Sequence, residues 1–234
     1  MLIQVAAAKV GKWGTSESGD TLEMIERPHG GISLVLADGQ SSGRAAKAIS
    51  NLVARKALAE LAEGVRDGAA ARAANDYLYT HRAGKVSATL NILSVDLVSK
   101  TLVLTRNSPC PFVARLPTGE IRVLAAPSEP IGVHRGTRPS IAELPLAAGT
   151  IVLAYTDGLE LAGALASPVF DVPAVLEHLL AQGCEDAPCL ADRLLAHALE
   201  LDEGRPRDDI SVVVLCVVDQ DSDGARRLSV HLPI

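Results

Sequence analysis

Three apolar runs in the chain meet an acidic residue at one end. The runs and their acids are residues 32–37 with Asp38, residues 150–155 with Asp157, and residues 210–218 with Asp208 and Asp209. Continuous apolar runs of this length, bounded by turn residues, are typical of buried strands. An acid at the end of such a strand lies at a sheet edge on backbone that the core holds in place, which is where we expect a rigid metal ligand or a catalytic carboxylate. An Asp-Gly pair alone is also an ordinary turn, so it is the recurrence that supports this interpretation.

The start of the chain places a fourth acid next to one of these three. The pattern predicts strands at residues 2–10, 21–26 and 32–37, a loop at 11–19 and a turn at 28–31. Asp20 closes the loop, and in an antiparallel pair the start of one strand lies beside the end of the next. We therefore expect Asp20 and Asp38 to lie close together, which like charges resist unless a cation lies between them.

Four further segments have the apolar spacing of helices with one buried face. They are residues 44–63, 66–79, 171–182 and 186–203. We expect Tyr77 on the buried face of the second helix, His81 and Arg82 in a loop at 80–85, and Pro188 in the first turn of the last helix. The remaining strands are expected at residues 87–97, 101–106, 111–116, 121–125, 141–144 and 228–232.

Composition excludes several classes of protein. The 234 residues are 48% hydrophobic with a net charge of −6, which predicts a globular fold in a single domain over 1–234 and argues against nucleic acid as a partner. The apolar runs are too short to span a bilayer and no signal peptide is visible, so we expect a cytoplasmic protein without a membrane partner. The four cysteines lack metal-ligand spacing and are expected to be free thiols in a reducing compartment.

The four acids at strand ends favour a metal site of hard oxygen ligands. Such a site suits Mg²⁺ or Mn²⁺, which take carboxylate, carbonyl and water ligands. Zinc is disfavoured because no histidine or cysteine shares these junctions. A calcium-stabilised structural sandwich is a poorer alternative, because no run of alternating acids with a glycine resembles a calcium loop.

Four ordered motifs resemble those of the metal-dependent serine/threonine protein phosphatases of the PPM, or type 2C, family. They are Ser18-Gly19-Asp20, the segment from Ala37-Asp38-Gly39 to Ala46, Tyr155-Thr156-Asp157-Gly158, and Arg207-Asp208-Asp209-Ile210-Ser211. The details, including residues 84–93, are similar to the SpoIIE-like branch and within it to the RsbX-type phosphatases of stressosomes. The resemblance implies an α+β fold, an α-β-β-α sandwich of two packed antiparallel sheets flanked by helix pairs. That agrees with the alternation of strand blocks and helix pairs along the chain.

The resemblance also implies residue roles and a cofactor. Asp38 would bridge two Mn²⁺ or Mg²⁺ ions, the Gly39 carbonyl would bind one of them, and Asp157 and Asp208 would hold the other. Asp20 would bind a metal or orient metal-bound water, the nucleophile. Asp209 would orient its neighbour without touching a metal.

Two features of the family have no counterpart here. Residues 15–18 contain no arginine to match the phosphate-binding arginine of the eukaryotic members, and Gln40 and Ser41 stand where those members have a histidine. The general acid is therefore unassigned.

The resemblance implies a protein-serine/threonine phosphatase acting on a cytoplasmic regulatory protein, with a phosphorylated STAS-domain component of a stressosome as the expected partner. The alternative is a catalytically weak or inactive regulator of the same fold that binds a phosphoprotein without hydrolysing it. The complete set of acids favours the enzyme, since a pure binder has no need to keep four carboxylates together.

Overall fold

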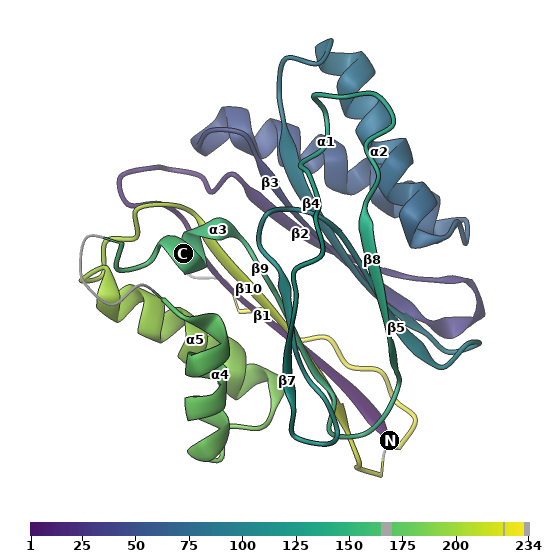
Figure 1. The fold of residues 1–234 in the computed structure, drawn as a ribbon, viewed down its shortest axis with the longest axis vertical. Coiled ribbons are helices and arrows are strands. Elements are labelled where there is room, and N and C mark those ends of the chain that lie inside the picture. Colours follow the sequence, from purple (N-terminus) through teal and green to yellow (C-terminus); the bar gives the residue numbers. More distant parts are fainter. Residues whose placement is uncertain (165–169, 222, 232–234) are drawn as a thin grey trace.

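Two antiparallel sheets pack face to face in the computed structural model, which describes residues 1–164, 170–221 and 223–231 (Figure 1). In these residues each sheet has five strands, in the order β1-β10-β9-β6-β7 and β2-β3-β4-β5-β8. The strands of the first sheet are β1 (Leu2–Val10), β6 (Phe112–Arg115), β7 (Ile121–Leu124), β9 (Ile151–Tyr155) and β10 (Ile210–Val218). Those of the second are β2 (Asp20–Glu26), β3 (Ile32–Gly39), β4 (Ala88–Asp96), β5 (Thr101–Asn107) and β8 (Ser140–Pro145).

Helix pairs cover the two outer faces of this sandwich. Helices α1 (Gly43–Ala62) and α2 (Asp67–Arg82) lie on the second sheet, and α4 (Val172–Ala181) and α5 (Ala187–Leu201) lie on the first (Figure 1). Asp171 and Asp186 cap α4 and α5 by accepting backbone N–H groups, each followed by a proline near the start of its helix. The predicted α+β sandwich is confirmed.

Alternation along the strands divides the core into three layers. Leu34 and Leu36 of β3 face the other sheet, whereas Val35 and Ala37 face α1 and α2. The side chains of the first sheet alternate in the same way. Val213 and Leu215 of β10 lie in the central layer, and their neighbours in sequence pack under α4 and α5. Every strand that enters the site therefore presents alternate residues to the space between the sheets.

The second helix is longer than the sequence pattern predicts. Helix α2 continues to Arg82 and ends where Ala83 adopts a left-handed conformation, so the prediction of a loop containing His81 and Arg82 is wrong. The sequence between the predicted end of the helix at residue 79 and Gly84 contains no helix-breaking residue. Tyr77 was expected to be buried but is 44% exposed and stacks on His81, because Asn75 takes the inward position and bonds to the loop that holds His134.

Two other local expectations change. A short helix that the pattern did not indicate, α3 (Asp157–Leu161), begins directly at Asp157. Residues 228–231 form no strand, and Leu228 and Val230 are more than three-quarters exposed, so alternation there does not reflect burial against a sheet. The last residue of that predicted strand, Leu232, lies outside the described residues. No helix in the described part of the chain has the length and apolar character to cross a membrane.

The cysteine prediction is wrong for two of the four residues. Cys184 and Cys189 form a disulfide that joins the middle of the α4–α5 loop to the first turn of α5, with 5.7 Å between their Cα atoms. Their spacing in sequence gave no indication of this pairing, because the turn after α4 brings them together. Cys110 and Cys216 are buried free thiols, as expected.

The central layer should dominate the stability of the fold. Leu104 is 1% exposed between the sheets, so Leu104→Ala removes buried methyl groups and leaves a cavity; we expect it to lower the free energy of unfolding by about 2–5 kcal/mol. Val123→Ala on β7, where the side chain is 48% exposed, is the matched control and should cost less than about 1 kcal/mol. Urea titration measures both, and equal losses would show that the inter-sheet layer is not the main core.

Candidate metal centre

Asp20 and Asp38 face each other at the open end of the central layer. They are paired residues in the register of β2 and β3, as the antiparallel arrangement predicts. Asp38 continues the set of Leu34 and Leu36 on the inner face of β3, so its side chain belongs to the space between the sheets. The core thus ends at this edge in two carboxylates instead of another apolar pair.

Asp20 is fully buried and its two oxygens have different environments. Oδ2 accepts hydrogen bonds from Ser211 Oγ at 2.6 Å and Thr156 Oγ1 at 3.0 Å. Oδ1 is buried and has no hydrogen-bond partner among the described residues. A buried carboxylate oxygen without a donor is costly, so the site lacks a group that would neutralise it.

The pKa values of the acids also indicate that the site lacks a neutralising group. Burial, then the charges of Asp20 and Asp157, and then the charge of Asp208 raise the pKa of Asp38 to about 9. Burial raises the pKa of Asp20 to about 6 against the opposing effect of its hydroxyl donors. The pKa of Asp157 is raised by burial and then by Asp208. The structure therefore brings together the four acids that the sequence pattern singled out.

Glycines allow the backbone to close tightly around these acids. A Cβ atom on Gly39 would lie 2.1 Å from the carbonyl oxygen of Ala46, and one on Gly158 would lie 2.2 Å from that of Asp209. Neither position can hold a side chain without moving the backbone, so the first turn of α1 and the start of β10 pack directly on the two Asp-Gly turns.

Asp209 fixes the loop of residues 11–19. It is 3% exposed; its Oδ1 accepts the Lys12 N–H at 2.9 Å and its Oδ2 accepts the Gly19 N–H at 2.8 Å. One carboxylate thus holds both ends of the loop that leads into Asp20. Within the loop, Trp13 is 63% exposed under the guanidinium of Arg205.

Sequence reasoning missed four residues at this edge: Lys9, Lys47, Thr156 and Ser211. The ammonium groups of Lys9 and Lys47 both donate to the main-chain carbonyl of Asp20. Thr156 and Ser211 stand two residues beyond inward-facing Ala154 and two residues before inward-facing Val213, so strand alternation could have indicated them.

The potential ligand atoms of the site fit a hard divalent cation better than any other bound species. They are carboxylate oxygens, one of them buried and without a hydrogen-bond partner among the described residues, and burial and the neighbouring acids raise the pKa of Asp38. Within the described residues, no three acidic, cysteine or histidine side chains already stand close enough to hold an ion. An ion bound here would therefore require the carboxylates to move closer together.

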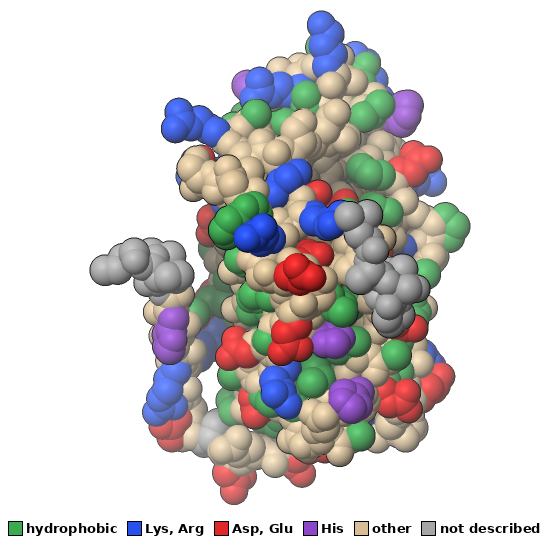
Figure 2. Space-filling model, turned by 90° about the vertical axis from the view of Figure 1, so that its left-hand side faces the viewer, with side chains coloured by type: hydrophobic (Ala, Val, Ile, Leu, Met, Phe, Trp, Pro, Cys, Tyr) green, Lys and Arg blue, Asp and Glu red, His purple; other side chains and the backbone are tan. Residues whose placement is uncertain are grey.

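Acidic and basic side chains are neighbours on this face of the molecule. Figure 2 looks at the end of the sandwich that lies on the left of Figure 1, where the loop of residues 11–19 and α3 are found. Red acidic side chains lie near the middle of the view, with blue lysine and arginine side chains directly above them. This face of the molecule therefore carries both charges close together.

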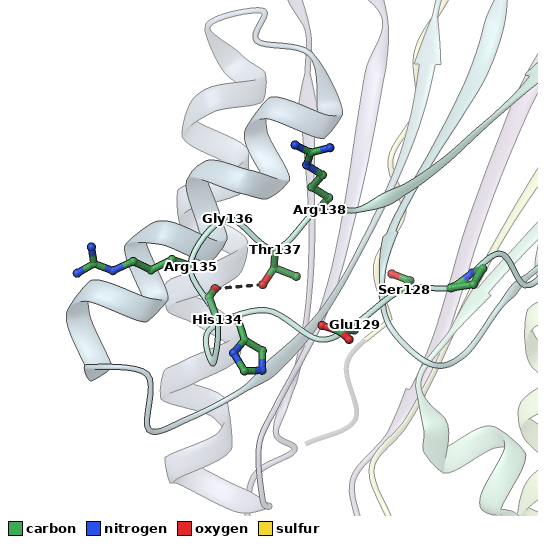
Figure 3. Close-up of a pocket in the computed structure, with 8 residues that line it drawn as sticks. Ser128, Glu129, His134, Arg135, Gly136, Thr137 and Arg138 are labelled. Carbon is green, nitrogen blue, oxygen red and sulfur yellow. Dashed lines mark hydrogen bonds between the residues drawn. The ribbon is translucent and has the colours of Figure 1, made fainter.

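A separate hollow of about 430 Å³ lies in the loop between β7 and β8. Residues 127–129 and 134–138 line it, and Figure 3 shows that Arg135 and Arg138 point to different sides while Thr137 bonds back to the His134 carbonyl. None of the four acids lines it. The loop approaches the sheet edge that holds the acids through Ile131, which forms an isolated β-bridge with Ala88.

Comparison with known proteins identifies relatives of this fold. A family model described as Stage II sporulation protein E (SpoIIE) matches residues 28–218. The SpoIIE phosphatase domain with a fragment of its regulatory domain, from Bacillus subtilis, has a TM-score of 0.80 at 21% identity, over 94% of this chain and 64% of that one. The chain therefore spans less than two thirds of that structure. No match among curated proteins reaches significance.

Two further structures are metal complexes. RsbX in complex with magnesium has a TM-score of 0.69 at 18% identity, over 92% of this chain and 95% of that one. The catalytic domain of the serine/threonine phosphatase PstP with two manganese ions has 0.71 at 21% identity, over 93% and 99%. At these identities the likeness establishes a common fold.

The raised pKa of Asp38 predicts how the metal-free protein responds to pH. Unfolded aspartate has a pKa near 3.9, so between about pH 4 and 9 the folded state binds more protons than the unfolded state. Stability without metal should therefore be highest at the acidic end of this range and fall as the pH rises. In EDTA at pH 8, Asp38→Asn should be more stable than the wild type by about 1 kcal/mol or more.

Urea titrations from pH 5 to 9 test this expectation. Asp192→Asn, which removes an exposed carboxylate from α5, is the control and should follow the wild-type profile. An Asp38→Asn profile that also follows the wild type would contradict the proposed strain between the buried acids.

Proposed function

Because the chain belongs to the SpoIIE family of PPM phosphatases, we propose that it is a metal-dependent serine/threonine phosphoprotein phosphatase. The observation that carries the proposal is the pairing of Asp20 with Asp38 at the open end of the core, where Asp20 Oδ1 is buried and finds no hydrogen-bond partner in the described part of the chain. A cation between the two strands would satisfy this oxygen and remove the repulsion.

The proposed ligands come from four strand ends. Asp38 and the Gly39 carbonyl would hold one Mn²⁺ or Mg²⁺ ion, Asp38 would share a second ion with Asp157 and Asp208, and Asp20 would complete the site. When bound, such a pair of ions lowers the pKa of a coordinated water and neutralises charge on a phosphoryl oxygen.

Other residues of the chain would keep the ligands in position. Ser211 and Thr156 hold Asp20 Oδ2 and leave Oδ1 directed at the site. Thr156 also donates to the Asp209 carbonyl, which ties the end of β9 to the start of β10. These bonds join three strands from two sheets, so the ligand geometry is supported by the whole sandwich.

We propose a phosphorylated STAS-domain protein of a stressosome-like complex in the cytoplasm as the substrate. Structural relatives support this class of partner: one is a structure of RsbU and RsbW domains from Mycobacterium tuberculosis, and another is described in work on the bacterial stressosome. The loops at residues 11–19 and 127–139 border the site and are the candidate surfaces for recognising a folded partner. Exposed Trp13 is the residue of the first loop best suited to contact one.

Activity measurements test the function directly. EDTA should abolish hydrolysis of p-nitrophenyl phosphate and of a phosphorylated STAS protein, Mn²⁺ should restore both, and Asp38→Asn should lower turnover by about 100-fold or more, because it removes the carboxylate shared by both ions. The matched control Asp192→Asn and the thiol variant Cys110→Ser should retain activity.

Three results would count against parts of the proposal. Turnover that survives EDTA but is lost on thiol alkylation would identify a cysteine phosphatase. Binding of the phosphoprotein without hydrolysis would support the inactive regulator instead. Hydrolysis of the small substrate with every STAS phosphosite left intact would refute only the partner.

A further inference from the structure

Two lysines from different layers of the fold meet at the main-chain carbonyl of Asp20. Lys9 lies near the end of β1 in the first sheet, and Lys47 lies in the second turn of α1, outside the second sheet. Lys9 Nζ donates to the Asp20 carbonyl, and Lys47 Nζ donates to the same oxygen at 2.6 Å and to Thr21 Oγ1 at 3.1 Å. The two ammonium groups are therefore immediate neighbours.

The position of Lys9 follows from strand alternation. Ile3 and Val5 of β1 pack in the central layer, so Lys9 has the same orientation at the open end of that layer. Its cross-strand partner is Ser211, whose hydroxyl donates to Asp20 Oδ2. Lys9 thus occupies the same edge as the proposed metal ligands, while its side chain is exposed and Lys47 is only half-buried.

Among the described residues, neither lysine is paired with a carboxylate at close range, although the charges of Asp20 and Asp209 attract Lys9 from farther away. In the part of the chain that the structure describes, neither ammonium group has a carboxylate oxygen within 4.0 Å. Both donate to a neutral carbonyl, although Asp20 offers a carboxylate on the same residue. Two like charges side by side repel, and this arrangement is stabilised when an anion lies against both.

We propose that Lys9 and Lys47 bind the phosphate group of the substrate at the edge of the metal centre. This inference rests on the proposed function and assigns the residues that position its phosphomonoester. An ammonium group carries three donors, and the observed bonds use one on Lys9 and two on Lys47, so both retain donors for phosphate oxygens. The dianionic phosphate would neutralise the lysine pair while its phosphorus faces the carboxylate side of the site.

A purely structural role predicts a different outcome. The bonds to Asp20 and Thr21 tie β1 and α1 to the start of β2, so loss of either lysine could lower stability without affecting an anion. The two roles separate because phosphate affinity in the folded, metal-loaded protein does not report on stability. Replacing both lysines by arginine keeps the charges and supplies donors to phosphate, whereas glutamine removes the charge at similar length.

The experiment measures inorganic phosphate binding to Mn²⁺-loaded protein by calorimetry, together with phosphate inhibition of p-nitrophenyl phosphate hydrolysis. Lys9→Gln and Lys47→Gln should each weaken phosphate binding by about tenfold or more and raise KM in proportion, since each removes a charge-assisted hydrogen bond. The double arginine variant should restore most of the affinity. Mn²⁺ affinity should be unchanged or increased in the glutamine variants, because they remove positive charge near the cations.

Lys100→Gln is the matched control. It removes the same charge from an exposed residue in the β4–β5 turn, beyond the Asp96–Thr101 pair and at the opposite end of the sheet from Asp38, and it should bind phosphate like the wild type. Phosphate affinity and KM that stay at wild-type values in both glutamine variants would overturn the proposal.

The same measurements separate this proposal from the proposed function. A wild-type protein that hydrolyses nothing but binds phosphate through these lysines would refute the phosphatase and keep the anion site. If the wild-type protein is active with Mn²⁺ but its phosphate binding does not depend on the two lysines, the phosphatase is kept and the anion site is refuted. A protein that binds no phosphate when loaded with Mn²⁺ would contradict the lysine proposal.

Discussion

Repulsion between Asp20 and Asp38 is the interaction on which this account of the structure depends. The two residues are opposite each other in the register of β2 and β3, at the end of a layer otherwise filled by apolar side chains. Burial keeps water from screening them, and Asp157 and Asp208 add further negative charge. A fold that places four acids at one edge, Asp20 fully buried and the other three half-buried, is stabilised when a cation neutralises them.

The rest of the sandwich explains why the acids cannot move apart. Asp38 is held by a strand in the middle of its sheet, and Gly39 allows α1 to pack directly on the turn. Asp20 is bound by hydroxyl groups of the opposite sheet, and Asp209 closes the loop that precedes it. Relief by rearrangement would therefore break contacts between the sheets.

Much of this arrangement could be predicted from local pattern. The buried strands that end in Asp-Gly predicted the sheet edge where the acids gather. The antiparallel arrangement predicted the pairing of Asp20 with Asp38. The bonds from Thr156 and Ser211 to Asp20 span 136 and 191 residues, and no local pattern carries such distances. Local pattern also cannot predict the contact of Lys9 with Lys47. In the sequence Lys9 is an ordinary residue near the end of an apolar strand, and only the packing of α1 places Lys47 beside it.

The wrong predictions have equally specific causes. Periodicity extended α2 only to the last clear apolar residue, although the helix continues until the left-handed Ala83, and Tyr77 has the spacing of a buried residue but is exposed. The disulfide between Cys184 and Cys189 depends on the geometry of the turn after α4. Each of these features is fixed by tertiary contacts that propensity does not include.

The most direct test of the central claim is the location of manganese in a crystal of the protein grown with Mn²⁺. Anomalous difference density should show ions within coordination distance of Asp38, about 2.0–2.3 Å, with Asp20, Asp157 and Asp208 around them. Manganese bound elsewhere, with these four carboxylates free of any ion, would contradict the account.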